Sequence, residues 1–147
     1  MITTVDVETS WQKTDTGGYD PSPFHPDNIL VSVGINDEYY FTNHSERVDE
    51  GCYHKIQSIL DKTTLLIGHN IKFDLMWLLE SGFKYTGRVY DTMLGEYILN
   101  RGIRKSLTLE MSCRRRKIGS KDSATVSYTH LRAHETPEHL VCRVLLE

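Results

Sequence analysis

Carboxylates in separate segments of this chain have the types and spacing of a divalent-cation site. Asp6 and Glu8 lie in the first segment, Asp74 in the second and Asp91 in a third. Three carboxylates gathered at about 6 Å repel one another by roughly 3 kcal/mol per pair at an effective dielectric of about 20. Mg²⁺ or Mn²⁺ removes that repulsion, because hard cations prefer oxygen ligands. Hydrolysis of a phosphodiester bond is the chemistry that such a cluster suits.

The first segment is a predicted strand. Residues 1–9 are mostly β-branched or apolar. Because side chains alternate between the two faces of a strand, Asp6 and Glu8 share one face, about 6.6 Å apart, and Val5 and Val7 share the other. Asp-x-Glu is frequent by chance, so this segment alone favours an ordinary surface strand end.

The second segment joins a predicted strand, residues 64–68, to a predicted helix, residues 71–81. Asp74 lies one turn into that helix, at the edge of an α/β sheet where ligand sites collect. Asn70 is interpreted equally as the N-cap of the helix and as a substrate contact. A favourable negative charge near the helix N-terminus is the alternative role for Asp74. His69 is interpreted as a packed or partly exposed histidine.

The third segment predicts a helix after Asp91, which we interpret as its N-cap and as a support for the neighbouring site. Glu96 is interpreted as a solvated residue of this helix. The residues predicted to form its buried stripe are Met93, Leu94, Tyr97 and Ile98. Further on, the basic run of residues 114–117 could attract a phosphate backbone, but a solvated helix face is the favoured interpretation.

These segments together resemble one family: VDVET at residues 5–9, GHNIKFDL at 68–75, and YDTML with YILN at 90–100. They resemble the 3′–5′ proofreading exonuclease domain of family A DNA polymerases, of the DEDD group, over residues 1–118. The resemblance implies a ribonuclease H-like α/β fold and a mechanism that uses two Mg²⁺ or Mn²⁺ ions. It implies that Asp6, Glu8 and Asp74 are the catalytic metal ligands, and that Thr9 and Asn70 contact the substrate. The implied partners are a single-stranded or frayed DNA 3′ end and a polymerase domain.

The chain departs from this family at its C-terminal end. The family's later Tyr-x-x-x-Asp or His-containing counterpart is missing, because Asp122 is the only Asp after Asn100 and has no suitably spaced Tyr or His. Residues 126–147 resemble a translated sequencing-adapter tail. We therefore predict a truncated exonuclease domain over residues 1–118, and a foreign or disordered tail over residues 119–147.

The rest of the pattern predicts a mixed sheet with flanking helices, incomplete at its C-terminus. After a loop over residues 11–27 come strands at 28–35 and 38–43, and a helix at 45–60. The buried face predicted for that helix consists of Val48, Cys52, Ile56 and Ile59.

Composition is that of a single globular domain, with a net charge of −3 that gives no overall attraction to nucleic acid. Cys52, Cys113 and Cys142 are scattered and suit a reducing cytoplasm. No apolar run approaches membrane-spanning length, and the start of the chain has no charged, apolar leader.

Three functional hypotheses remain open. The first is a metal-dependent DNA 3′–5′ exonuclease, impaired by its truncation. The second is an RNA-trimming enzyme similar to ribonuclease D, which shares the same carboxylates. The third is a catalytically silent remnant that binds nucleic acid.

Overall fold

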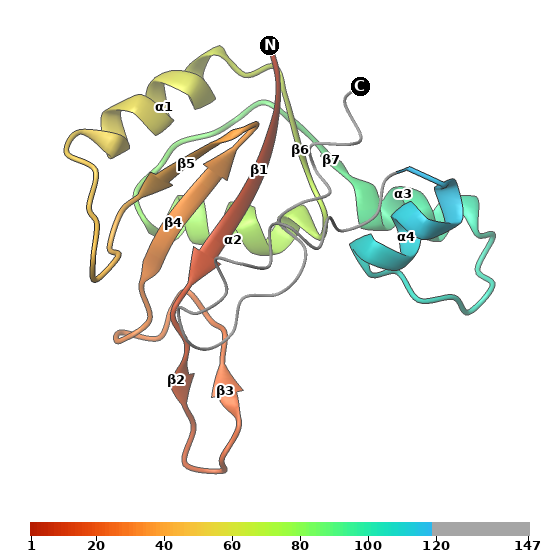
Figure 1. The fold of residues 1–147 in the computed structure, drawn as a ribbon, viewed down its shortest axis with the longest axis horizontal. Coiled ribbons are helices and arrows are strands. Elements are labelled where there is room, and N and C mark those ends of the chain that lie inside the picture. Colours follow the sequence, from red (N-terminus) through yellow and green to blue (C-terminus); the bar gives the residue numbers. More distant parts are fainter. Residues whose placement is uncertain (119–147) are drawn as a thin grey trace.

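The computed structural model describes residues 1–118. They form an α/β fold in which a mixed five-stranded sheet is flanked by helices (Figure 1). The elements along the chain are β1 (Ile2–Thr9), β2 (Gln12–Lys13), β3 (Tyr19–Asp20), β4 (Leu30–Ile35), β5 (Glu38–Phe41), α1 (Cys52–Lys62), β6 (Leu65–Gly68), α2 (Ile71–Glu80), β7 (Arg88–Asp91), α3 (Thr92–Leu99) and α4 (Leu109–Arg116).

The sheet places β1 at its centre, in the order β5-β4-β1-β6-β7. β4 pairs with β1 and β5 with β4 in antiparallel fashion, whereas β6 pairs with β1 and β7 with β6 in parallel. Leu65 to Ile67 of β6 pair with Ile2 to Thr4 of β1, so β6 and β7 end beside the middle of β1, and β1 continues beyond them to Thr9. α2 and α3 begin just after β6 and β7. The predicted fold class, the strands at 1–9 and 64–68 and the helix at 71–81 are therefore confirmed to within a few residues.

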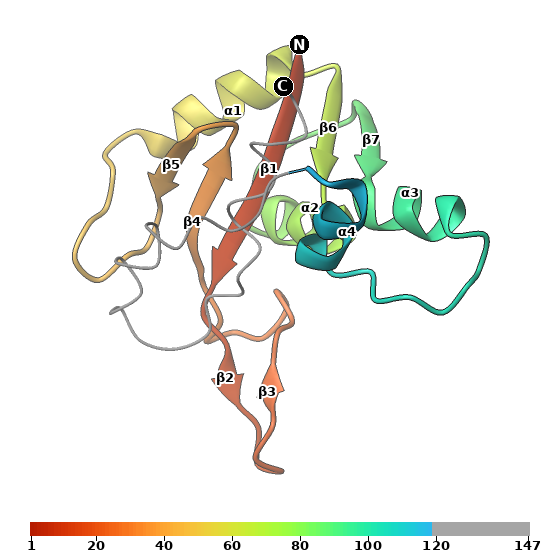
Figure 2. The same cartoon turned by 45° about the vertical axis from the view of Figure 1, so that its right-hand side comes forward.

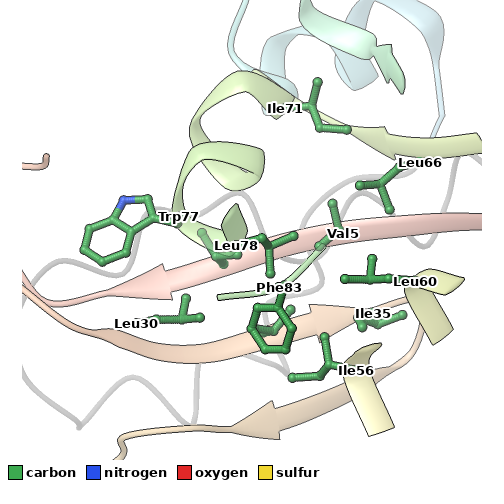
Figure 3. Packing of buried hydrophobic residues seen from close by; sticks show 12 residues of the cluster. Val5, Leu30, Ile35, Ile56, Leu60, Leu66, Ile71, Trp77, Leu78 and Phe83 are labelled. Atoms are coloured by element: carbon green, nitrogen blue, oxygen red, sulfur yellow. The ribbon is translucent and has the colours of Figure 1, made fainter. Parts of the chain in front are cut away.

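One face of the sheet carries the main core, as Figure 3 shows. The strands contribute Val5, Val7, Leu30, Val33, Ile35 and Leu66, and the other side is supplied by Ile56, Leu60, Ile71, Trp77, Leu78 and Phe83. The odd-numbered valines of β1 point into this core, so alternation turns Asp6 and Glu8 to the opposite face. Both carboxylates are half-buried there.

Two predicted segments differ from the structure. The helix expected at 45–60 begins only at Cys52, because Gly51 has a left-handed φ of 72° and Asp49 accepts a hydrogen bond from the backbone N–H of Phe41. Val48, predicted to be buried, is therefore exposed. The predicted loop at 11–27 contains the hairpin β2–β3, which projects beyond the end of β1 (Figure 1).

The predicted buried stripe of α3 is wrong. Leu94, Tyr97 and Ile98 are each more than half exposed. Residue spacing identified the helix, but burial depends on another layer covering that face, and spacing carries no information on this point.

The predicted foreign tail at 119–147, with Cys142, lies outside the described residues. Cys52 and Cys113 are buried free thiols. Among the helices of residues 1–118, none is both long and apolar enough to cross a lipid bilayer.

Candidate carboxylate site

Asp74 is the most deeply buried carboxylate of the predicted site, with only 3% of its surface exposed. It lies one turn into α2, and its Oδ1 atom accepts a hydrogen bond from the backbone N–H of Val7 in β1, at 3.1 Å. Burial, and then the negative charge of Asp6, raise the pKa of Asp74 to about 8. The structure thus brings Asp74 against β1 and close enough to Asp6 for their charges to interact.

Glu8 and Thr9 lie at the end of β1, where its pairing with β4 is irregular. Asp6 is opposite Gly34 and Glu8 opposite Ser32, but the register then shifts between Glu8 and Thr9. Such irregularities redirect side chains and are frequent next to active sites. The Oγ1 atom of Thr9 accepts a hydrogen bond from the indole Nε1 of Trp11, at 2.7 Å, which orients the threonine side chain.

Asn70 occupies the N-cap position of α2, as predicted, but its side chain forms no capping hydrogen bond. Its φ is 61°, in the left-handed region that Asn tolerates better than most residues. Its backbone N–H donates to Asp91 Oδ1 at 3.0 Å, and its surface is exposed. Helix capping therefore does not account for the amide side chain, and a substrate contact stays a prediction.

Asp91 is the N-cap of α3, as predicted. Its Oδ1 atom accepts hydrogen bonds from the backbone N–H groups of Met93, at 2.9 Å, and Leu94, at 3.4 Å. The same oxygen accepts the N–H of Asn70, so one carboxylate links the first turns of α2 and α3. This contact joins Asp91 to the segment that carries Asp74.

Carboxylate oxygens are suitable ligands for a divalent cation, but the described residues do not form a complete set of metal ligands. Within residues 1–118, no three His, Cys, Asp or Glu side chains converge in a metal-binding group. The coupled pair of Asp6 and Asp74 is the part that fits, because two neighbouring carboxylates are costly to ionise together without a cation.

His69 is a packed residue, in agreement with its interpretation from the sequence. Its Nε2 atom lies 2.8 Å from the carbonyl oxygen of Leu107, and its Nδ1 atom lies 2.9 Å from the hydroxyl oxygen of Thr92. Because a carbonyl can only accept, Nε2 carries a proton and donates it. His69 therefore ties the end of β6 to the segment that leads into α4.

We expect His69→Ala to lower the free energy of unfolding by about 1–2 kcal/mol, because two hydrogen bonds are lost. Hydrogen exchange should show the loss mainly in α4. His54→Ala is the control, since His54 is exposed on α1. Equal protection of α4 in the two variants would contradict the role of His69 as a tie.

Glu96 is buried, which corrects its interpretation as a solvated residue. It forms ion pairs with Arg115, at 3.0 Å, and with Arg116, and it accepts a hydrogen bond from Asn100. Burial alone would raise the pKa of Glu96, but hydrogen bonds and charges from Arg116 and Arg115 outweigh it and lower the pKa. The basic run at 114–117 is thus divided by its contacts: Arg114 and Lys117 are exposed and form no ion pair within residues 1–118, whereas half-buried Arg115 and the more exposed Arg116 hold α4 against α3.

A mainly apolar cavity of about 260 Å³ lies beside this ion-pair network. It opens between the sheet and the two last helices, and its lining includes Thr4, Ile67, Tyr90, Leu99, Leu109 and Ile118. Thr4 and Ile67 belong to the sheet face opposite the main core. Asp6 and Asp74 do not line this cavity, so it is distinct from the carboxylate site.

The family model of the 3′–5′ exonuclease matches residues 14–112, more than half of the chain. The matched range contains Asn70, Asp74 and Asp91 but begins after Asp6 and Glu8. No curated protein sequence matches the chain. A mixed sheet with α2 and α3 starting at the edge where Asp74 meets Asp6 agrees with a nuclease domain. The chain therefore belongs to the 3′–5′ exonuclease family, and so to the hydrolases.

Proposed function

We propose that this chain is a divalent-metal-dependent exonuclease domain that removes nucleotides from DNA 3′ ends, and that it derives from a DNA polymerase with a proofreading activity. The observation that carries the proposal is the hydrogen bond from the Val7 N–H to buried Asp74, which places this carboxylate against the strand that carries Asp6 and Glu8. Family membership supports the nuclease activity. The domain proposed for this activity comprises residues 1–118, with residues 119–147 as a foreign tail.

In this proposal, Asp6, Glu8 and Asp74 would hold Mg²⁺ or Mn²⁺. Such cations, when bound, supply a nucleophilic water and stabilise the leaving 3′ oxygen in phosphodiester hydrolysis. The chain's own groups position the strand and the ligands. The N–H of Val7 fixes one oxygen of Asp74, and Asp91 fixes the backbone of Asn70. The exposed amide of Asn70 and the hydroxyl of Thr9 are the proposed contacts to the terminal nucleotide.

The test is hydrolysis of a single-stranded DNA labelled at its 5′ end, with Mg²⁺, with Mn²⁺ and with EDTA. We expect shortening from the 3′ end that requires the metal, and a loss of at least about a thousandfold in Asp6→Ala, comparable to the loss of a major catalytic group. Asp15→Ala, an exposed carboxylate on the β2–β3 hairpin, is the control. Cleavage in EDTA, or from the 5′ end, would contradict the proposal.

Two further outcomes separate the alternatives. A clear preference for an RNA strand over the matched DNA strand would select an RNA-trimming activity. Binding of DNA without hydrolysis, with either metal, would select the catalytically silent remnant. The incomplete metal group within residues 1–118 favours the remnant as the second candidate, and leads us to expect slow turnover at best.

A further inference from the structure

Charge is divided unequally along the described chain. Residues 1–100 contain fifteen acidic and seven basic side chains, whereas residues 101–118 contain one acidic and seven basic side chains. The overall charge of −3 hides this division. The basic residues belong to a part of the fold that we call the basic lobe, residues 92–118, which comprises α3, the linking segment and α4. Figures 1 and 2 show this lobe at the side of the sheet away from α1.

Ion pairs within the basic lobe hold α4 against α3, and only two of the lobe's basic side chains take part in them. Arg115 and Arg116 pair with Glu96, and Arg115 also donates to the carbonyl oxygen of Ser106, at 2.7 Å. The remaining basic side chains form no ion pair within the described chain, and all are exposed: Arg101, Arg104, Lys105, Arg114 and Lys117. Their positive charge is therefore not balanced by the lobe itself.

The lobe lies next to the edge of the sheet that carries the carboxylate site. His69 joins Leu107 of the linking segment to the end of β6, one residue before Asn70. Asp91, which holds the backbone of Asn70, is the N-cap of α3. An extended polyanion that follows the lobe would therefore continue toward Asn70, Asp74 and Asp6.

We propose that the basic lobe binds the sugar-phosphate backbone of a single-stranded nucleic acid, upstream of the 3′ end that reaches the carboxylate site. The direction of the strand rests on the proposed function; the backbone contact itself rests on the charge of the lobe. α4 has eight residues and is about 12 Å long, the reach of a few consecutive phosphates. Tyr97 of α3 is 53% exposed and could stack on a base, a contact that an acidic protein partner would not use.

The experiment measures fluorescence anisotropy of labelled oligo-dT on the 147-residue chain in EDTA, so that hydrolysis plays no part. Strands of about twenty and about four nucleotides are compared across a series of salt concentrations. The variant is Arg104→Gln/Lys105→Gln/Arg114→Gln. Its matched control, Lys55→Gln/Lys62→Gln/Lys84→Gln, removes the same charge from exposed positions on α1 and after α2. Thermal unfolding of both variants verifies that they fold.

We expect the lobe variant to bind the long strand about ten to a hundred times more weakly than the control variant, with a salt slope smaller by about 2, because each lost phosphate contact contributes roughly 0.7. The short strand should bind weakly to all three proteins. Equal binding of the long strand by the two variants, or equal binding of long and short strands by the parent chain, would overturn the proposal. So would polyglutamate or phosphatidylserine vesicles that compete as well as oligo-dT does.

The proposed activity can fail independently of this inference. Loss of long-strand binding in the lobe variant, in a chain that hydrolyses no DNA with either metal, supports the backbone contact and contradicts only the exonuclease proposal. If the lobe variant still hydrolyses DNA and binds the long strand as tightly as the parent chain does, only the proposed backbone contact is contradicted.

Discussion

Asp74→Asn should make the protein more stable in alkaline solution and remove most of the pH dependence of its stability. The pKa of Asp74 is about 8 in the folded chain, compared with about 3.9 for an unfolded Asp. Between these values the folded state binds a proton that the unfolded state has lost, so stability falls as pH rises from about 4 to 8. A shift of this size corresponds to about 6 kcal/mol at most.

The Asn side chain is a close match in shape and keeps the oxygen that accepts the Val7 N–H. Urea unfolding at about pH 5 and about pH 9 should show a large loss of stability in the parent chain and a small one in the variant. Asp15→Asn, at an exposed position, should behave like the parent. If the free energy of unfolding changed equally with pH in the parent and in Asp74→Asn, the loss of stability in alkaline solution would not be due to the burial of Asp74.

Mg²⁺ or Mn²⁺ extends this prediction to the proposed site. A cation between Asp6 and Asp74 stabilises the ionised carboxylates, so it should restore stability at about pH 9 in the parent chain. Asp74→Asn should gain little from the metal, because one ligand has lost its charge. An equal gain in both proteins would place the bound cation elsewhere.

Glu96→Ala is the second substitution with a large expected effect. It removes the acceptor from Arg115, whose side chain is 21% exposed, and from Arg116. Removing Glu96 leaves both arginine charges unpaired, but Arg116 is 42% exposed, so we expect a loss between those of a surface pair and a fully buried pair, about 2 kcal/mol. Urea unfolding gives this loss directly. Glu80→Ala, which removes an exposed carboxylate from the end of α2, is the matched control and should change stability little.

The pH dependence of this effect has the opposite sign to that of Asp74. The pKa of Glu96 is lowered in the folded chain, so its contribution is present above the ordinary Glu pKa and is lost as pH falls through the lowered value. The difference in stability between the parent and Glu96→Ala should therefore narrow in acid. A difference below about 1 kcal/mol at neutral pH would be typical of a surface pair and would contradict the buried network.

The local elements were predictable because they depend on neighbouring residues. Strand alternation separated Asp6 and Glu8 from Val5 and Val7, and the Asp91 cap and the strand before Asn70 were recognisable from residue type. The sequence motifs at residues 68–75 and 90–94 indicated the family, and the match of the family model over residues 14–112 confirms it. These signals require no knowledge of distant contacts.

Other features required the tertiary structure, because they depend on which segments meet. No spacing rule pairs Glu96 with Arg115 and Arg116 or leaves Tyr97 exposed, since the packing of α4 on α3 decides both. Residue types and spacing were enough to identify the family, the fold class and the candidate carboxylates. The burial of Asp74 beside Asp6 could be seen only in the folded chain. Its raised pKa depends on this removal from water and on a charge 68 residues earlier in the chain, and local sequence patterns report neither.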